Sequence, residues 1–172
     1  MPEEGCLVHN KPMLVSFFES VKYVGHLLPI SFLRIFLGYY YLEQALIKYR
    51  GDFLTRPRIA DQIAEWLPAS HAPNWYKVFV SAQVIPHWQT VAFIILGLEF
   101  AVAVSYIAGY VVRPVALLGV LLCLNMLFMS GPGFEDFYKT ILAVHVMMAW
   151  VGAGRCLGFD YYFFKRRRGI WW

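Results

Sequence analysis

Long apolar stretches separated by short polar breaks cover most of this chain. A helix needs around 20 residues to cross the hydrocarbon layer of a bilayer. Four stretches reach or approach that length, at residues 27–47, 90–112, 114–130 and 137–158. The pattern therefore predicts an all-α protein in which a bundle of four transmembrane helices occupies residues 27–160.

Two of the breaks are short enough to be tight turns. Arg113 and Pro114 mark the reversal between the second and third stretches, and proline is tolerated at the first position of a helix. The sequence SGPG at residues 130–133 separates the third and fourth stretches and is followed by Glu135 and Asp136, acidic residues that favour a helix N-terminus. We therefore expect two antiparallel hairpins, with Pro114 beginning the third helix.

The connection at residues 49–89 is too long to be a simple turn. Pro57 can begin a short helix there, and a second helical segment fits between Pro73 and Pro86. One face of the first helix gathers apolar side chains, namely Ile59, Ile63, Trp66 and Leu67. We expect both short helices to lie at the outer interface of the bilayer.

Three tryptophans of this connection, Trp66, Trp75 and Trp88, suit the headgroup level of a bilayer, where tryptophan is enriched. Two interpretations of the connection stay open. It either seals the bundle or offers a docking surface to a protein partner outside the cytoplasm.

Positive charge is concentrated near the end of the chain, in a basic run formed by Lys165, Arg166, Arg167 and Arg168. Lys and Arg are enriched on the cytoplasmic side of membrane helices, and a basic run beside an apolar segment is typical of a membrane anchor. An even number of spans places both ends of the chain on one side. We therefore expect residues 1–26, as an interfacial segment, and the aromatic and basic tail 161–172 on the cytoplasmic side of the cell inner membrane.

The composition agrees with lipid as the main solvent. Of the 172 residues, 59% are apolar and 15% are charged, against about 45–50% and about 25% in ordinary soluble domains. This argues against a soluble enzyme. The net charge of +4 comes largely from the basic run, so we expect the lipid bilayer as a partner and no nucleic acid. The three cysteines form no CxxC motif, and no disulfide framework, thiol relay or metal site is predicted.

Polar side chains inside the predicted spans include Arg34 and Glu43 in the first, Glu99 in the second, Asn125 in the third and His145 in the fourth. An ionisable group at membrane depth costs about 2.5–3.5 kcal/mol on insertion scales, so each needs a partner or a function. With a rise of about 1.5 Å per residue, Glu99, Asn125 and His145 reach a similar depth, while Arg34 lies closer to the cytoplasm. This polar layer either holds the helices in register, for example through a Glu99–Arg34 ion pair, or binds a quinone headgroup.

Other titratable side chains are interpreted differently. Glu43 and Lys48 lie near the outer interface, where we expect them to be solvated or bound to the long connection. His145 is the only histidine in mid-span, and the cysteines lack the spacing of an iron–sulfur cluster. Any electron centre therefore belongs to a quinone or to a partner protein.

Several of these residues, in this order, resemble the DoxX/DoxD-like family of small four-helix membrane proteins. The resemblance runs from Phe32 to Asp160. It rests on FLRIFLGYYYLEQALIKY from Phe32 onward, GLE at 97–99, Gly109 with Arg113, Asn125, the turn at 131–133, and GAGR at 152–155 before Asp160.

The resemblance carries expectations about function. Relatives include the membrane subunit of a thiosulfate:quinone oxidoreductase and a protein that assembles with a sulfurtransferase and a superoxide dismutase. It implies quinone as the ligand, with Arg34, Glu99 and Asn125 as the residues to test. We therefore expect an accessory or quinone-interacting subunit of a membrane redox or stress-related complex, and no residue is assigned a catalytic role. A purely structural subunit is the alternative, and a small transporter is the third possibility.

Overall fold

The computed structural model describes residues 25–130 and 133–161, and these contain helices and connections but no strand. The elements, in order, are η1 (Gly25–Leu27), α2 (Leu28–Arg50), α3 (Arg58–Trp66), α4 (Asn74–Phe79), η2 (Val80–Val84), α5 (Trp88–Ala108), α6 (Val112–Met129), α7 (Glu135–Val151) and η3 (Ala153–Arg155). The all-α class is therefore confirmed.

Two parts of the sequence-based prediction fall largely outside the described residues. They are the expected interfacial segment 1–26 and the aromatic and basic tail 161–172, of which only residues 25, 26 and 161 are described. The membrane anchor that we expect in this tail lies wholly outside the described residues, at Lys165, Arg166, Arg167 and Arg168. Its role as an anchor, and the cytoplasmic location that it indicates, therefore stay predictions.

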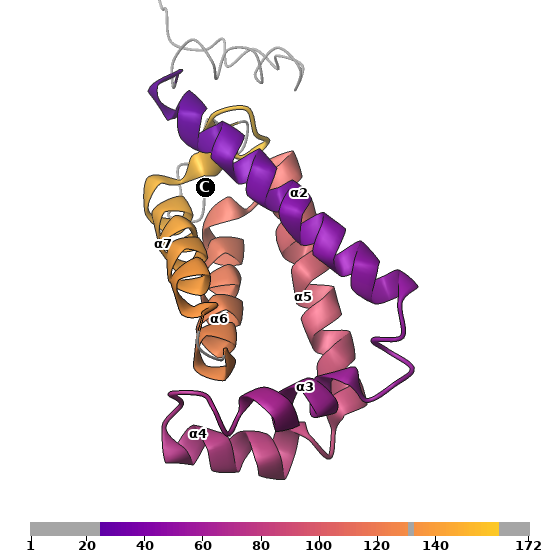
Figure 1. The fold of residues 1–172 in the computed structure, drawn as a ribbon. Helices are drawn as coiled ribbons and strands as arrows, with labels where there is room; N and C mark the ends of the chain where they lie inside the picture. The colour runs from indigo at the N-terminus through magenta and orange to yellow at the C-terminus, as the bar shows by residue number, and fades with distance from the viewer. Residues whose placement is uncertain (1–24, 131–132, 162–172) are drawn as a thin grey trace, which may run out of the picture.

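The four long helices form two pairs, in which α2 packs along α5 and α6 packs along α7. The pairs come together where α2 begins and α7 ends, which we call the closed end (Figure 1). They diverge toward the opposite end, the open end, and α3 and α4 lie across it (Figure 1). The long connection is thus a cap over the open end of the bundle.

Two apolar clusters hold this arrangement together. One lies among the long helices and includes Leu37, Val102 and Met148. The other joins the cap to the open ends of α5 and α6 through Ile63 and Met129, among others. The cap is therefore packed on the bundle as part of one folded unit.

Two helices, α5 and α6, are long and apolar enough to cross a membrane, with mean hydropathies of 2.2 and 2.0. Only 33% and 28% of their most apolar stretches are buried inside the protein. The other residues of these stretches are at least partly exposed, and exposed apolar side chains such as Phe93 in α5 and Leu117 in α6 lie on their outer faces. That any of the four long helices crosses a membrane stays a prediction.

The turn between α5 and α6 lies earlier than we predicted. α5 ends at Ala108, followed by Gly109 in the left-handed conformation with φ +66°. α6 begins at Val112, so Pro114 occupies its first turn and not its first position. The chain reverses at Gly109 because glycine adopts positive φ without steric strain.

The last long helix is shorter than predicted. α7 ends at Val151 and not at residue 158, because Gly152 takes the left-handed conformation with φ +69°. The chain then forms η3 and turns across the closed end. Its carbonyl groups are consequently available to other parts of the protein instead of to a helix.

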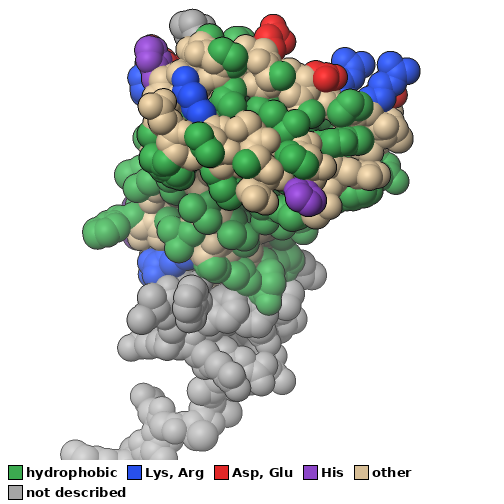
Figure 2. Space-filling view, turned by 90° about the horizontal axis from the view of Figure 1, so that it is seen from below, with side chains coloured by type: hydrophobic (Ala, Val, Ile, Leu, Met, Phe, Trp, Pro, Cys, Tyr) green, Lys and Arg blue, Asp and Glu red, His purple; other side chains and the backbone are tan. Residues whose placement is uncertain are grey.

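Both short helices of the long connection are present. α3 buries Ile59 and Ile63 as its periodicity predicted, and the segment between Pro73 and Pro86 forms α4 and η2, with Tyr76 and Val80 buried. The opposite side of α4 carries exposed apolar side chains, including Trp75 at 66% exposure. Figure 2, a view from the cap side, shows hydrophobic side chains spread over this face, with most charged ones near its edges.

Candidate functional site

Arg34 in α2 is fully buried at the closed end. Its Nη1 donates to the Ala153 carbonyl at 3.2 Å, and its Nη2 donates to the Leu157 carbonyl at 2.7 Å. A Cβ at Gly109 would overlap the guanidinium, so glycine is required there for space as well as for its positive φ. Arg34 therefore ties α2 to the segment that follows α7.

Asp160 completes the same end of the bundle. Its Oδ1 accepts from the Val111 backbone N–H at 2.7 Å and its Oδ2 from the Val112 N–H at 3.1 Å. These N–H groups belong to the N-cap residue and the first residue of α6; they have no acceptor inside the helix and favour a negative charge. Burial raises the pKa of the Asp160 carboxyl, and the two N–H groups and the charge of Arg34 oppose that rise. We call Arg34, Asp160 and these backbone partners the clasp.

His145 in α7 is fully buried in the middle of the bundle. Its Nε2 lies 2.8 Å from the Tyr41 hydroxyl of α2, and its Nδ1 lies 2.6 Å from the Tyr106 hydroxyl of α5. The ring also rests on Gly119 of α6, where a Cβ would overlap it. Side chains or backbone of all four long helices therefore meet at this histidine.

The hydrogen atoms around His145 can be assigned by satisfying every polar group. A neutral imidazole has one donor and one acceptor nitrogen, so one tyrosine donates to the ring and the other accepts from it. The Tyr41 hydroxyl also lies 3.5 Å from Cys123 Sγ. We therefore assign Tyr106 as donor to Nδ1, Nε2–H as donor to Tyr41, and Tyr41 as donor to Cys123. This arrangement agrees with the interpretation of His145 as a residue that fixes helix register.

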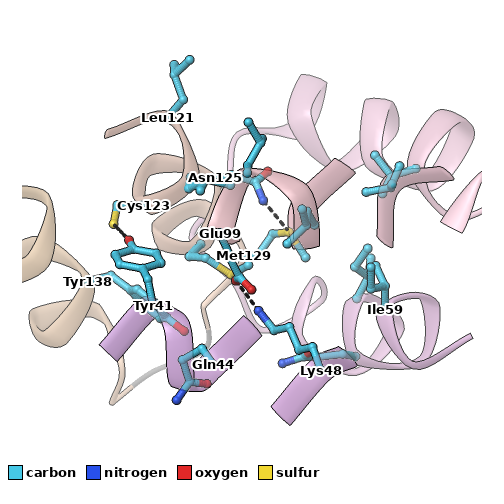
Figure 3. A pocket seen from close by; sticks show the side chains of 18 of the residues that line it. Tyr41, Gln44, Lys48, Ile59, Glu99, Leu121, Cys123, Asn125, Met129 and Tyr138 are labelled. Atoms are coloured by element: carbon cyan, nitrogen blue, oxygen red, sulfur yellow. Dashed lines mark hydrogen bonds and ion pairs between the residues drawn. The ribbon is translucent and has the colours of Figure 1, made fainter. Parts of the chain in front are cut away.

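A cavity of about 460 Å³ lies between the two helix pairs and beneath the cap. That volume is in the range of small-molecule sites, about 300–1,000 Å³. Most of the lining is apolar, and the polar lining residues labelled in Figure 3 are Tyr41, Gln44, Lys48, Glu99, Asn125 and Tyr138. Leu121, which lines the cavity, is 63% exposed, so the cavity reaches the outer surface beside α6.

Lys48 and Glu99 form an ion pair at the cavity wall, between Nζ and Oε1 (Figure 3). The Glu99 side chain is only 8% exposed. Its second oxygen, Oε2, is buried and has no hydrogen-bond partner among the described residues. A buried carboxylate oxygen without a donor is unfavourable, and such atoms mark places where a ligand group can bind.

Asn125 connects the cavity to the cap. Its Oδ1 accepts from the Tyr76 hydroxyl of α4 at 2.6 Å. Its Nδ2 contacts only the weak acceptor Met129 Sδ, at 3.6 Å, among the described residues. The amide N–H groups of Asn125 therefore keep most of their capacity to bind a ligand oxygen.

The phenol of Tyr76 gives the cap a pH dependence. Burial raises the pKa of Tyr76 to about 12, so its neutral form is favoured by folding. The stabilisation is complete below the usual tyrosine pKa of about 10 and is lost as the pH rises toward the folded value. We expect the stability of the wild type to fall more steeply between pH 10 and 12 than that of Tyr76→Phe, measured by chemical unfolding at each pH. Tyr49→Phe removes an exposed tyrosine and should keep the wild-type slope; equal slopes for all three proteins would contradict the prediction.

The structure divides the predicted site residues into three groups. Glu99 and Asn125 line the cavity together, whereas His145 lies in the neighbouring layer and Arg34 at the closed end. The ion pair suggested between Glu99 and Arg34 is not the one observed, because Glu99 binds Lys48. Of the three interfacial tryptophans, Trp66 also lines the cavity.

Sequence reasoning missed several polar residues of the cavity wall. Lys48 was expected in solvent or bound to the long connection; its Nζ does lie over the Phe53 ring of that connection, 5.4 Å from the centroid, but it also forms the ion pair with Glu99, which was not foreseen. Tyr41, Gln44 and Lys48 lie at positions i, i+3 and i+7 of α2 and all line the cavity. That spacing places them on one helix face, and it was the signal that could have identified them.

Comparison of the chain with protein-family models, curated proteins and solved structures finds no match. Within residues 25–130 and 133–161, no group of three His, Cys, Asp or Glu side chains is arranged to hold a metal ion. The function therefore has to be argued from the cavity and its chemistry.

Proposed function

We propose that this chain is an integral membrane protein of the DoxX/DoxD-like kind that binds a quinone in the cavity, as an accessory subunit of a membrane redox or stress-related complex. One observation carries the proposal. A partly buried Lys48–Glu99 ion pair and the Asn125 amide line a mainly apolar cavity of about 460 Å³. Apolar walls with a few converging polar groups are the usual form of a small-molecule site.

A membrane location is supported by more than α5 and α6. α2 and α7 also expose large apolar side chains, among them Phe36 at 67% and Trp150 at 83%. Apolar surface on all four long helices fits contact with lipid. We therefore keep the four-helix transmembrane bundle, with both termini in the cytoplasm of a cell with an inner membrane, as part of the proposal.

The cavity suits both the polar headgroup and the apolar isoprenoid tail of a quinone. The ammonium of Lys48 and the amide of Asn125 can donate to the carbonyl oxygens of the headgroup. Apolar side chains such as Ile95 and Leu122 surround the space beside them. The exposed Leu121 at the cavity mouth would let the isoprenoid tail pass into the lipid.

A substitution that fills the cavity tests this proposal without altering its charges. Ile95→Trp places a larger side chain at the cavity wall, whereas Ile94→Trp changes the adjacent residue, which is 55% exposed and does not line the cavity. We expect decylubiquinone binding, measured by calorimetry in mild detergent, to weaken at least about tenfold in Ile95→Trp and to stay near the wild-type value in Ile94→Trp. The proposal fails if the wild type binds neither the quinone nor its reduced form.

The accessory role rests on a separate observation. The cap exposes an apolar face formed by Trp75, Val78 and Phe79, which suits either headgroup contact or a protein partner. Co-purification from native membranes tests this part of the proposal. A protein that elutes alone, as a monomer or homodimer, would count against a subunit role but leave the quinone site standing.

A further inference from the structure

The Glu99 carboxylate has one satisfied and one unsatisfied oxygen. Oε1 accepts from Lys48, whereas Oε2 is buried and without a partner among the described residues. Rotation about the last side-chain bond exchanges the two oxygens, so either can take the unsatisfied position. Glu99 lines the cavity, so a small rotation of its carboxylate would turn this hydrogen-bond acceptor, which the described residues leave unused, toward a ligand in the cavity.

Donors are also present at the cavity wall. Lys48 has three N–H groups, and the Asn125 amide has only Met129 Sδ as a described acceptor. A ligand group that satisfies this wall must donate to Glu99 and accept from Lys48 or Asn125. A hydroxyl group does both, whereas a quinone carbonyl can only accept.

We infer that the cavity selects the hydroquinone form of its ligand, whose O–H donates to Glu99 while its oxygen accepts from Lys48 or Asn125. This inference rests on the proposed function and adds the form of the ligand to it. The apolar lining strengthens the selection, because a ligand without the donor leaves a buried carboxylate oxygen unpaired where no water replaces it. Sites built to bind a hydroxyl discriminate strongly against analogues that lack it.

Three probes of similar shape test the inference: decylhydroquinone, decylbenzoquinone and the dimethyl ether of decylhydroquinone. Their binding to the purified wild-type chain is measured by calorimetry in mild detergent under argon, which keeps the hydroquinone reduced. We expect the hydroquinone to bind at least about tenfold more tightly than either of the others. The comparison between ligands needs no variant, so it does not depend on the folding of a mutant.

The variant Glu99→Gln then tests whether the preference for hydroquinone over the other two probes comes from the Glu99 carboxylate. The amide can donate to a quinone carbonyl, so we expect the preference for hydroquinone to fall to about threefold or less. Glu43→Gln, which changes an exposed glutamate of α2, should keep the wild-type preference. A Glu99→Gln protein that retains its helical circular dichroism and the full preference would overturn the assignment.

The possible outcomes separate the inference from the proposed function. Equal binding of all three probes overturns the inference but leaves a quinone site. Absence of binding for all three overturns both. A hydroxyl-bearing lipid headgroup offers the same chemistry, so the titration is repeated in phosphatidylcholine and phosphatidylglycerol nanodiscs. Loss of hydroquinone binding only with phosphatidylglycerol would assign the site to lipid and overturn the inference.

Discussion

Replacing Arg34 with methionine should lower the free energy of unfolding by about 3–5 kcal/mol. This is the range observed when one member of a buried pair of charged side chains is removed. Arg34 is fully buried and donates to the Ala153 and Leu157 carbonyls. Methionine fills part of the volume but donates nothing. Both carbonyls would lose the Arg34 donor, which leaves Ala153 the 3.4 Å contact from Ser31 Oγ, and Asp160 would lose a neighbouring positive charge.

The clasp predicts a graded result for a second substitution. Lysine keeps the charge at position 34 but offers a single ammonium, which cannot reproduce the planar fork that bonds two carbonyls. The free energy of unfolding of Arg34→Lys should therefore lie between that of the wild type and that of Arg34→Met. Unfolding in mixed micelles with increasing dodecyl sulfate, followed by circular dichroism, provides the measurement.

A matched control is available at the surface. Arg56 forms an ion pair with Asp52, and both side chains are exposed, at 69% and 49%. Exposed pairs contribute about 0–1 kcal/mol, so Arg56→Met should change stability little. If Arg34→Met costs less than about 1 kcal/mol, the clasp is not a main support of the closed end.

Gly119→Ala should destabilise the protein by about 1–3 kcal/mol, although it adds a single methyl group. A Cβ at this position would overlap the His145 ring. The ring cannot move away without lengthening its hydrogen bonds to Tyr41 or Tyr106, which lie at 2.8 and 2.6 Å. The close contact between α6 and α7 is therefore coupled to the hydrogen bonds of two further helices.

The same change from glycine to alanine at position 97 should not lower the stability of the protein. Gly97 lies inside α5, and an added Cβ there meets no atom within 4 Å. Alanine is favoured over glycine in a helix by about 1 kcal/mol, so Gly97→Ala should be neutral or stabilising. Both variants are measured by the unfolding experiment described for Arg34. Equal effects at the two positions would show that the His145 layer tolerates extra volume.

A double variant isolates the contact itself. If Gly119→Ala destabilises the protein because its Cβ overlaps the imidazole ring, it should lower the free energy of unfolding by less in a protein that already carries His145→Ala. The difference between the two costs is the coupling energy, which is about 0.5–3 kcal/mol for residues in contact. A coupling energy near zero would place the cost elsewhere in α6.

Part of the cap could be predicted because its pattern is local. Pro57 followed by apolar residues at helical spacing predicted α3, and Ile59 and Ile63 are buried as expected. The ends of the longer helices were harder to predict. α7 ends at Val151 and not at residue 158; Gly152 is a local stop signal, but the apolar residues that continue past it favoured a longer span.

That early end has a direct effect on the polar residues. A helix continued to residue 158 would have used the carbonyls of its last turns for its own hydrogen bonds. Because the helix stops, the Ala153 and Leu157 carbonyls accept from Arg34 instead. The polar partner of Arg34 was therefore backbone, and a search among ionisable side chains of the spans suggested the wrong one.

Depth along a helix was likewise insufficient to find the partners of Glu99 and His145. Residues at one depth can lie on different helix faces, and helical rise says nothing about the direction in which a face points. Glu99 meets Lys48 because α2 packs along α5, and the long lysine side chain reaches the cavity wall. His145 meets two tyrosines that carry no charge and gave no signal in a search for ionisable groups.

The sequence by itself determined that the chain is helical and which side chains would be expensive to leave without partners, because both depend on residue type and local spacing. Only the tertiary structure decided which of them meet. The divergence of the two helix pairs brings Lys48, Glu99 and Asn125 to one cavity and separates them from Arg34 and His145. Contacts between helices depend on their rotation and crossing, which are set by packing over the whole bundle and not by any one segment.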